Sequence, residues 1–116
     1  MYKIIIFIIL IYNLQSANST TLSWGYIRDG QVLLFDQFFH DRDDLCKLEP
    51  REFFFSTLGA RISAIHVTDL TGDEGGSAEI VQGGIGFTYV KLKLIPNDHI
   101  LLLNVEIFGA HDERFS

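Results

Sequence analysis

The feature that most restricts the fold of this 116-residue sequence is a two-residue alternation of apolar and polar side chains near its C-terminus. Residues 89–95 and 99–108 both place apolar side chains at alternate positions. This is the period of a β-strand with one buried face, and no 3.6-residue helical period competes with it. The side chains expected to face the core are Val90, Leu92 and Leu94 in the first run and Leu101, Leu103, Val105 and Ile107 in the second.

Four further runs are typical of strands, and short turn sequences separate them. These runs are residues 21–27, 31–39, 62–70 and 78–82. In the second run, Val32, Leu34 and Asp36 alternate against Leu33 and Phe35. Six or seven strands spaced by roughly 8–12 residues predict a single all-β domain, an antiparallel sandwich or barrel.

The segment between residues 40 and 57 is harder to interpret. Residues 40–44, His-Asp-Arg-Asp-Asp, are expected to form a charged loop. Residues 46–57 contain three consecutive phenylalanines, 53–55, so a strand here would be covered on both faces. Pro50 also allows a helical turn at this point, because proline suits the first turn of a helix.

The first 19 residues have the layout of a secretory signal peptide. Lys3 precedes an apolar run at residues 4–12, and small residues follow at Ser16, Ala17 and Ser19. The run is shorter than the roughly 20 residues that a membrane-spanning helix needs. Cleavage between Ser16 and Ser19 would leave residues 20–116 as a secreted domain without a membrane span. The alternative is that residues 4–12 form a buried first strand.

The charge of the chain argues against binding to nucleic acid. The net charge is −6, and loss of Lys3 with the signal peptide makes it −7. Phosphate backbones and anionic membranes repel such a chain. The densest acidic group is Asp41, Asp43 and Asp44, which is either a solvated loop or a patch for a basic protein partner.

Cys46 is the only cysteine, so no intramolecular disulfide can form and stability must come from packing. Two interpretations of this residue remain open. It is either a small buried apolar residue or an exposed free thiol that links two chains. The sequence therefore leaves a monomer and a Cys46-linked dimer as alternatives.

Three glycines, Gly83, Gly84 and Gly86, lie between two strand-like runs. A dinucleotide-binding loop would need a further glycine and a following helix, and a P-loop would need Gly-Lys-Ser/Thr, which is absent. We interpret the cluster as a tight turn and predict a positive φ at Gly84 or Gly86.

Other sequence features do not indicate catalysis or metal binding. Residues 69–74 have the composition of a calcium loop without its spacing. The four histidines lack the spacing of metal ligands, and no G-x-S-x-G motif occurs. We therefore expect no enzymatic activity, no metal and no cofactor.

An ordered set of residues carries a family resemblance. The set is Trp24, Gly25, Gly30 and Leu33, then Ile62, Ile65 and Asp69, then Ala78, Ile80 and the three glycines, then Val90 and Leu92, and finally Val105, Ile107, Phe108 and Gly109. In this order they resemble the insect multiprotein bridging factor two family, or transcription activator family, which has many small secreted members. Residues 38–56 depart from the family pattern.

The resemblance implies a co-activator that bridges a DNA-bound regulator to general transcription factor IIA through protein contacts, without a catalytic site. A signal peptide conflicts with that nuclear role. We therefore expect a secreted, non-enzymatic protein-interaction domain, with the nuclear co-activator as the alternative. A weaker alternative is a carrier of a small apolar ligand, because a phenylalanine-rich barrel can hold one.

Overall fold

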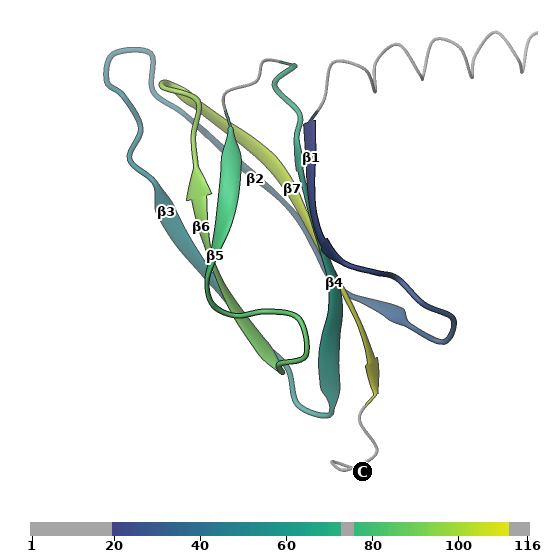
Figure 1. Ribbon diagram of the computed structural model, residues 1–116. Coiled ribbons are helices and arrows are strands. Elements are labelled where there is room, and N and C mark those ends of the chain that lie inside the picture. The colour runs from purple at the N-terminus through teal and green to yellow at the C-terminus, as the bar shows by residue number, and fades with distance from the viewer. Residues whose placement is uncertain (1–19, 73–75, 112–116) are drawn as a thin grey trace, which may run out of the picture.

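Seven β-strands make up most of the part of the chain that the computed structural model describes, residues 20–72 and 76–111 (Figure 1). Their bounds are β1 Thr20–Gly25, β2 Val32–Arg42, β3 Arg51–Ser56, β4 Ala60–Asp69, β5 Ser77–Gly83, β6 Tyr89–Ile95 and β7 Ile100–His111. The predicted all-β class and strand number are confirmed. The predicted signal peptide, residues 1–19, lies outside the described residues.

The strands form two antiparallel sheets. The four-stranded sheet has the order β1-β4-β7-β2, and the three-stranded sheet has the order β3-β6-β5. The two sheets face each other in Figure 1, with β3 and β6 opposite β2 and β7. The fold is therefore a sandwich of four and three strands, and the barrel alternative does not apply. Within the described residues, no helix is long and apolar enough to cross a membrane.

One cluster of apolar side chains fills the space between the sheets. Val90, Leu92 and Leu94 of β6 are fully buried against residues of β4 and β7. The predicted inward positions of β7 are buried as well: Leu101, Leu103, Val105 and Ile107. The alternation in the sequence therefore identified the buried face of both central strands.

Irregularities in the ladders change which side chains face inward. The register of β2 against β7 shifts between Leu33 and Phe35, so Leu34 and Phe35 both pack against the core. The predicted strict alternation in this run is therefore wrong, because a bulge adds a residue and reverses the pattern. A similar shift in β4 occurs between Ile62 and Ala64.

Two expectations for residues 40–57 need correction. Residues 40–42 belong to β2, so the charged loop begins at Asp43. Residues 51–56 form a strand without a helical turn, and only one of its faces is covered, because Phe54 is exposed while Phe53 and Phe55 pack on the core. An antiparallel sheet that packs on the core with one face leaves its other face open to solvent.

The glycine cluster is a turn, as predicted, and it joins β5 to β6. Positive φ occurs at Gly84 (110°) and Gly86 (89°), and also at Gly83 (70°). The turn reaches across to the other sheet, where the Gly86 amide donates to the Ile62 carbonyl (2.8 Å) and the Ile62 amide donates to the Phe87 carbonyl (2.8 Å). These bonds close one end of the sandwich.

Candidate interaction surface

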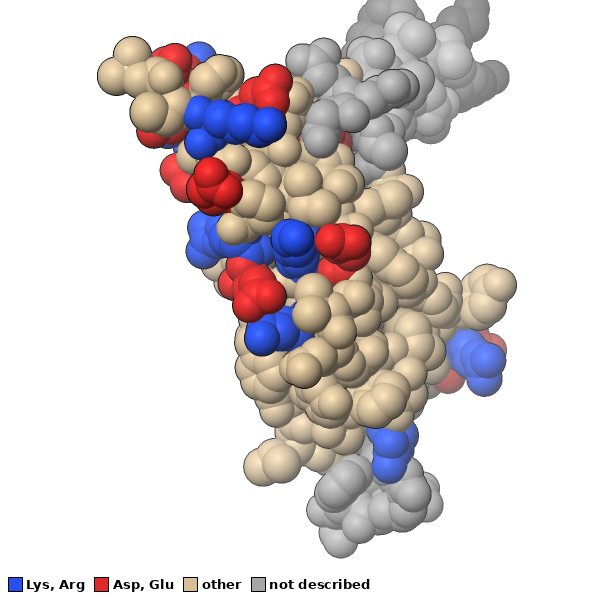
Figure 2. Space-filling model, turned by 60° about the vertical axis from the view of Figure 1, so that its left-hand side comes forward, with Lys and Arg blue, Asp and Glu red and all other residues tan. Residues whose placement is uncertain are grey.

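The outer face of the three-stranded sheet carries a ladder of opposite charges. Lys91 and Lys93 project from β6, between Glu52 of β3 and Glu79 of β5. The Lys91 ammonium lies 3.4 Å from the Glu52 carboxylate, and the Lys93 ammonium lies 3.9 Å from the Glu79 carboxylate. Acidic and basic side chains lie side by side over this part of the surface in Figure 2, and a broad uncharged region adjoins them. The ladder thus leaves little net charge on the face.

Three aromatic rings continue the same face beyond the charged ladder. Phe54 stacks on Tyr89 with ring centroids 6.1 Å apart, and Phe87 meets Tyr89 edge to face at 5.5 Å. We call Phe54, Phe87 and Tyr89 the aromatic patch. Phe54 is 58% exposed and Phe87 is 49% exposed. Large exposed aromatic side chains are the type that contributes most to binding at protein interfaces.

The glycine turn positions this patch. The Phe87 amide donates to the Gly84 carbonyl (3.0 Å), and the Gly84 amide donates to the Tyr89 carbonyl (2.9 Å). The turn therefore holds Phe87 beside Tyr89 at the start of β6. In the neighbouring connection, the Thr57 amide donates to the Thr88 carbonyl (3.0 Å), which fixes the end of β3 against the same turn. Both flanks of the patch are held by backbone hydrogen bonds, so its geometry is largely preformed.

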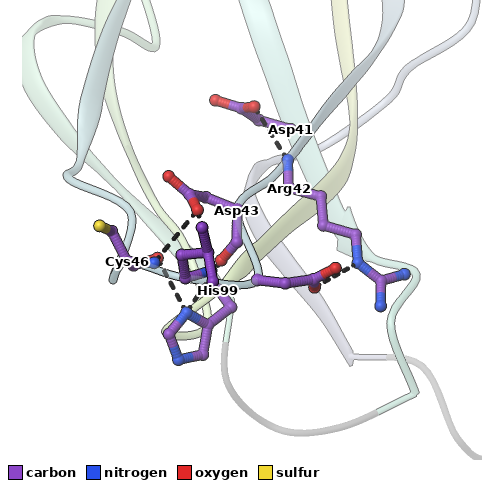
Figure 3. A network of polar contacts seen from close by, with 7 residues as sticks. Asp41, Arg42, Asp43, Cys46 and His99 are labelled. Atoms are coloured by element: carbon purple, nitrogen blue, oxygen red, sulfur yellow. Dashed lines mark hydrogen bonds and ion pairs between the residues drawn. The ribbon is translucent and has the colours of Figure 1, made fainter.

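At the opposite end of the sandwich, the acidic residues lie at the end of β2 and in the loop that follows, and their charges bind within this segment (Figure 3). The Asp43 carboxylate accepts hydrogen bonds from the amides of Leu45 (3.0 Å) and Cys46 (3.1 Å). Arg42 Nε lies 2.9 Å from the Asp44 carboxylate, and Asp41 accepts from the Arg42 amide. These contacts explain the acidic cluster structurally, and its role as a partner patch stays a prediction.

His99 closes this loop from the start of the β7 hairpin. Its Nδ1 lies 2.9 Å from the Asp43 carbonyl oxygen and 2.8 Å from the Cys46 carbonyl oxygen. The hydrogen bonds to the backbone of Cys46 and Asp43 raise the pKa of His99, since they favour its protonated ring. Cys46 itself is exposed, so its interpretation as a buried apolar residue is wrong. The link of two chains through this exposed thiol stays a prediction.

Asp69 has a structural role at the end of β4. It is 2% exposed, and its carboxylate accepts hydrogen bonds from the amide and hydroxyl of Thr71 and from the amide of Gly76. Asp69 thus holds the two ends of the 70–76 connection, of which residues 73–75 lie outside the described part. Within residues 20–72 and 76–111, no group of three His, Cys, Asp or Glu side chains could hold a metal ion.

The other residues of the family pattern also serve the fold. Ala78, Val90, Leu92, Val105 and Ile107 are buried, and Trp24 packs against the core from β1. An added Cβ at Gly25 or Gly109 would overlap the carbonyl oxygen of Ser63 or Arg61, respectively. The pattern therefore specifies the sandwich, and it does not include Phe54 or Phe87 of the aromatic patch.

Sequence reasoning did not single out the aromatic patch. The available signal was that Phe54 is one residue out of phase with Phe53 and Phe55. In the ladder between β3 and β6, Phe54 pairs with Lys91, whereas Phe53 pairs with buried Leu92. A phenylalanine opposite a lysine lies on the outer face, because paired residues in an antiparallel ladder share a face.

Comparison with known protein families identifies a match. A family model described as transcription activator MBF2 covers residues 24–109. This range includes every described strand except the first part of β1 and the last two residues of β7. A comparison with curated proteins finds no match.

Proposed function

We propose that this chain, which belongs to the MBF2 transcription activator family, is a secreted, non-enzymatic domain that binds a partner protein through its aromatic patch. The family is not an enzyme family, and its name implies a role in bridging proteins. The single observation that carries the proposal is the pair of exposed rings, Phe54 and Phe87, that both pack on the half-buried ring of Tyr89 on a rigid sheet. Such a surface loses little side-chain entropy on binding, which favours affinity.

The charged ladder beside the patch suits the rim of such an interface. Its lysines and glutamates neutralise one another, so they add little to affinity in water. They do penalise a partner that would place an unpaired charge against them. The contact would therefore consist of an apolar centre from Phe54, Phe87 and Tyr89 and a polar flank from the ladder. The carrier of a small apolar ligand gains no support, because the facing side chains of the two sheets pack together as one core.

Truncating the aromatic patch should weaken partner binding strongly without unfolding the domain. The double variant Phe54→Ala and Phe87→Ala removes two exposed rings, and we expect capture of the partner to fall by about 10-fold or more. The measurement is quantitative affinity capture from the fluid into which the chain is exported, followed by mass spectrometry. Ile27→Ala, another exposed apolar residue outside the patch, is the matched control. Equal capture by the double variant and the wild type would refute this function.

Export is a separate part of the proposal and rests on residues 1–19. We expect the protein produced in its own cells to be found outside them, with a new N-terminus between residues 17 and 20. Mass spectrometry of the intact protein tests this directly. Intact Met1 in a nuclear or cytosolic pool would instead support the alternative, a co-activator that bridges a DNA-bound regulator to factor IIA.

A further inference from the structure

Strand β2 has a long free edge. It pairs with β7 on one side, from Val32 to Arg42, and no strand of the described chain pairs with its other side. The register shift lies near its N-terminal end, so residues 35–42 run without irregularity. An exposed strand edge of this length can accept another strand unless charges, prolines or bulges protect it.

The edge of β2 is less protected than the edge of β5. Strand β5 has a register shift between Ile80 and Gln82 in its centre. Residues 35–41 of β2 contain no lysine, arginine or proline and two acidic residues, Asp36 and Asp41, and their outer face presents Phe38, which is 63% exposed. An exposed phenylalanine in the middle of an open edge favours pairing with another strand.

The direction of the backbone amide and carbonyl groups identifies which residues of β2 could form hydrogen bonds with an added strand. The Asp43 amide donates to the His99 carbonyl (2.9 Å), in register with the pairs that precede it in β2. In an antiparallel ladder, residues alternate between bonding to the neighbouring strand and pointing away from it. Odd-numbered residues near this end of β2 therefore bond to β7. The amide and carbonyl groups of Asp36, Phe38 and His40 consequently point to the free edge.

The side chains select one arrangement for that edge. Suppose that a second copy pairs antiparallel with β2 so that Phe38 lies opposite Phe38 of the other copy. Asp36 then lies opposite His40 of the other copy, and symmetry makes this pair occur twice. All three side chains are exposed and share the outer face. A register centred on Asp36 would instead oppose two carboxylates, which is unfavourable. The Phe38-centred register combines an aromatic pair with two pairs in which the imidazole of His40 can hydrogen-bond to the Asp36 carboxylate.

We infer that the chain forms a symmetric homodimer in which the β2 edges of two copies pair antiparallel about Phe38. The two four-stranded sheets then become one continuous sheet of eight strands. A two-fold axis requires the same surface on both partners, and this register meets the requirement. The contact is independent of Cys46 and lies on the other sheet from the aromatic patch.

Sedimentation equilibrium of the chain without residues 1–19, in reducing buffer, tests the dimer. We expect a concentration-dependent dimer for the wild type, and Phe38→Lys should raise its dissociation constant by about 10-fold or more. Leu58→Lys makes the same chemical change at a residue that is 95% exposed in the β3–β4 connection, and it should leave the dimer intact. A monomeric wild type, or equal effects of the two variants, would overturn the inference.

A charge exchange tests the register. Asp36→Lys and His40→Glu should each weaken the dimer, because the first removes the carboxylate that His40 of the other copy would contact and the second opposes a glutamate to Asp36. The double variant opposes a lysine to a glutamate and should recover much of the lost affinity, a signature that damage to the monomer would not produce. Additive weakening in the double variant would rule out the Phe38-centred register.

Discussion

Replacing Gly83 with alanine should lower the free energy of unfolding by about 3 kcal/mol or more. Two costs add at this residue. Its φ of 70° is unfavourable for any residue with a Cβ. An added Cβ would also overlap the carbonyl oxygen of Tyr89 and lie 2.8 Å from its ring. Because the last register pair of β5 and β6 joins Gly83 to Val90, relief of the overlap must separate the strands. Urea unfolding followed by circular dichroism measures the loss.

Gly86→Ala is the matched control for that experiment. Gly86 also has a positive φ, 89°, but a Cβ built there meets no atom within 4 Å. Only the backbone strain remains, so the expected cost is about 1–2 kcal/mol. Equal losses for the two variants would show that the structure relieves the overlap between a Cβ at Gly83 and Tyr89 without a loss of stability. A larger loss at Gly86 would contradict the geometry of the turn.

The glycine turn shows how far local sequence information reaches. Glycines between two strand patterns predicted a turn with positive φ, because that conformation depends on the residue itself. The contact of the turn with Ile62 joins residues more than twenty positions apart. No local pattern contains such a contact, so the closed end of the sandwich could not be predicted.

The central strands were predictable because both of their flanks are occupied. In β6 and β7, the inner side chains enter a shared core, and the apolar residues of the sequence alternate in the same way as the buried residues. In edge strands, the alternation of apolar and polar side chains is less regular. In β2, charged residues 40–42 extend the strand into solvent, and a bulge reverses the alternation near Leu34. Here the pattern of apolar residues indicates neither the strand end nor its buried face.

The candidate surfaces were missed for the same physical reason. Phenylalanine is usually buried, so exposure was not expected for Phe54, in a run taken as covered on both faces, and was not considered for Phe38. Both lie on edge strands and face solvent. Conversely, the acidic cluster attracted interest because it is charged, yet its carboxylates bind its own loop. In this fold, exposed apolar residues are therefore better candidates for contact than the acidic residues.

The second large effect is expected in the core of the three-stranded sheet. Leu92→Ala should destabilise the domain by about 3–4 kcal/mol, from lost burial and from the cavity left behind. Leu92 is fully buried at the centre of β6, and its strand neighbours are Phe53 on β3 and Ile80 on β5. These neighbours are fixed by their ladders, so the site cannot collapse freely around the smaller side chain. Urea unfolding again provides the measurement.

Lys93→Ala tests the adjacent residue of the same strand, whose side chain faces outward. Its closest charged contact, with Glu79 at 3.9 Å, is solvent-exposed and contributes little to stability. We expect a change of less than about 0.5 kcal/mol. Leu92 and Lys93 differ by one position, so a large contrast can only come from the face of the sheet that each side chain occupies. Similar losses for both variants would mean that the two sheets do not pack as a sandwich, and Phe54, Phe87 and Tyr89 would then have no rigid support from which to bind a partner.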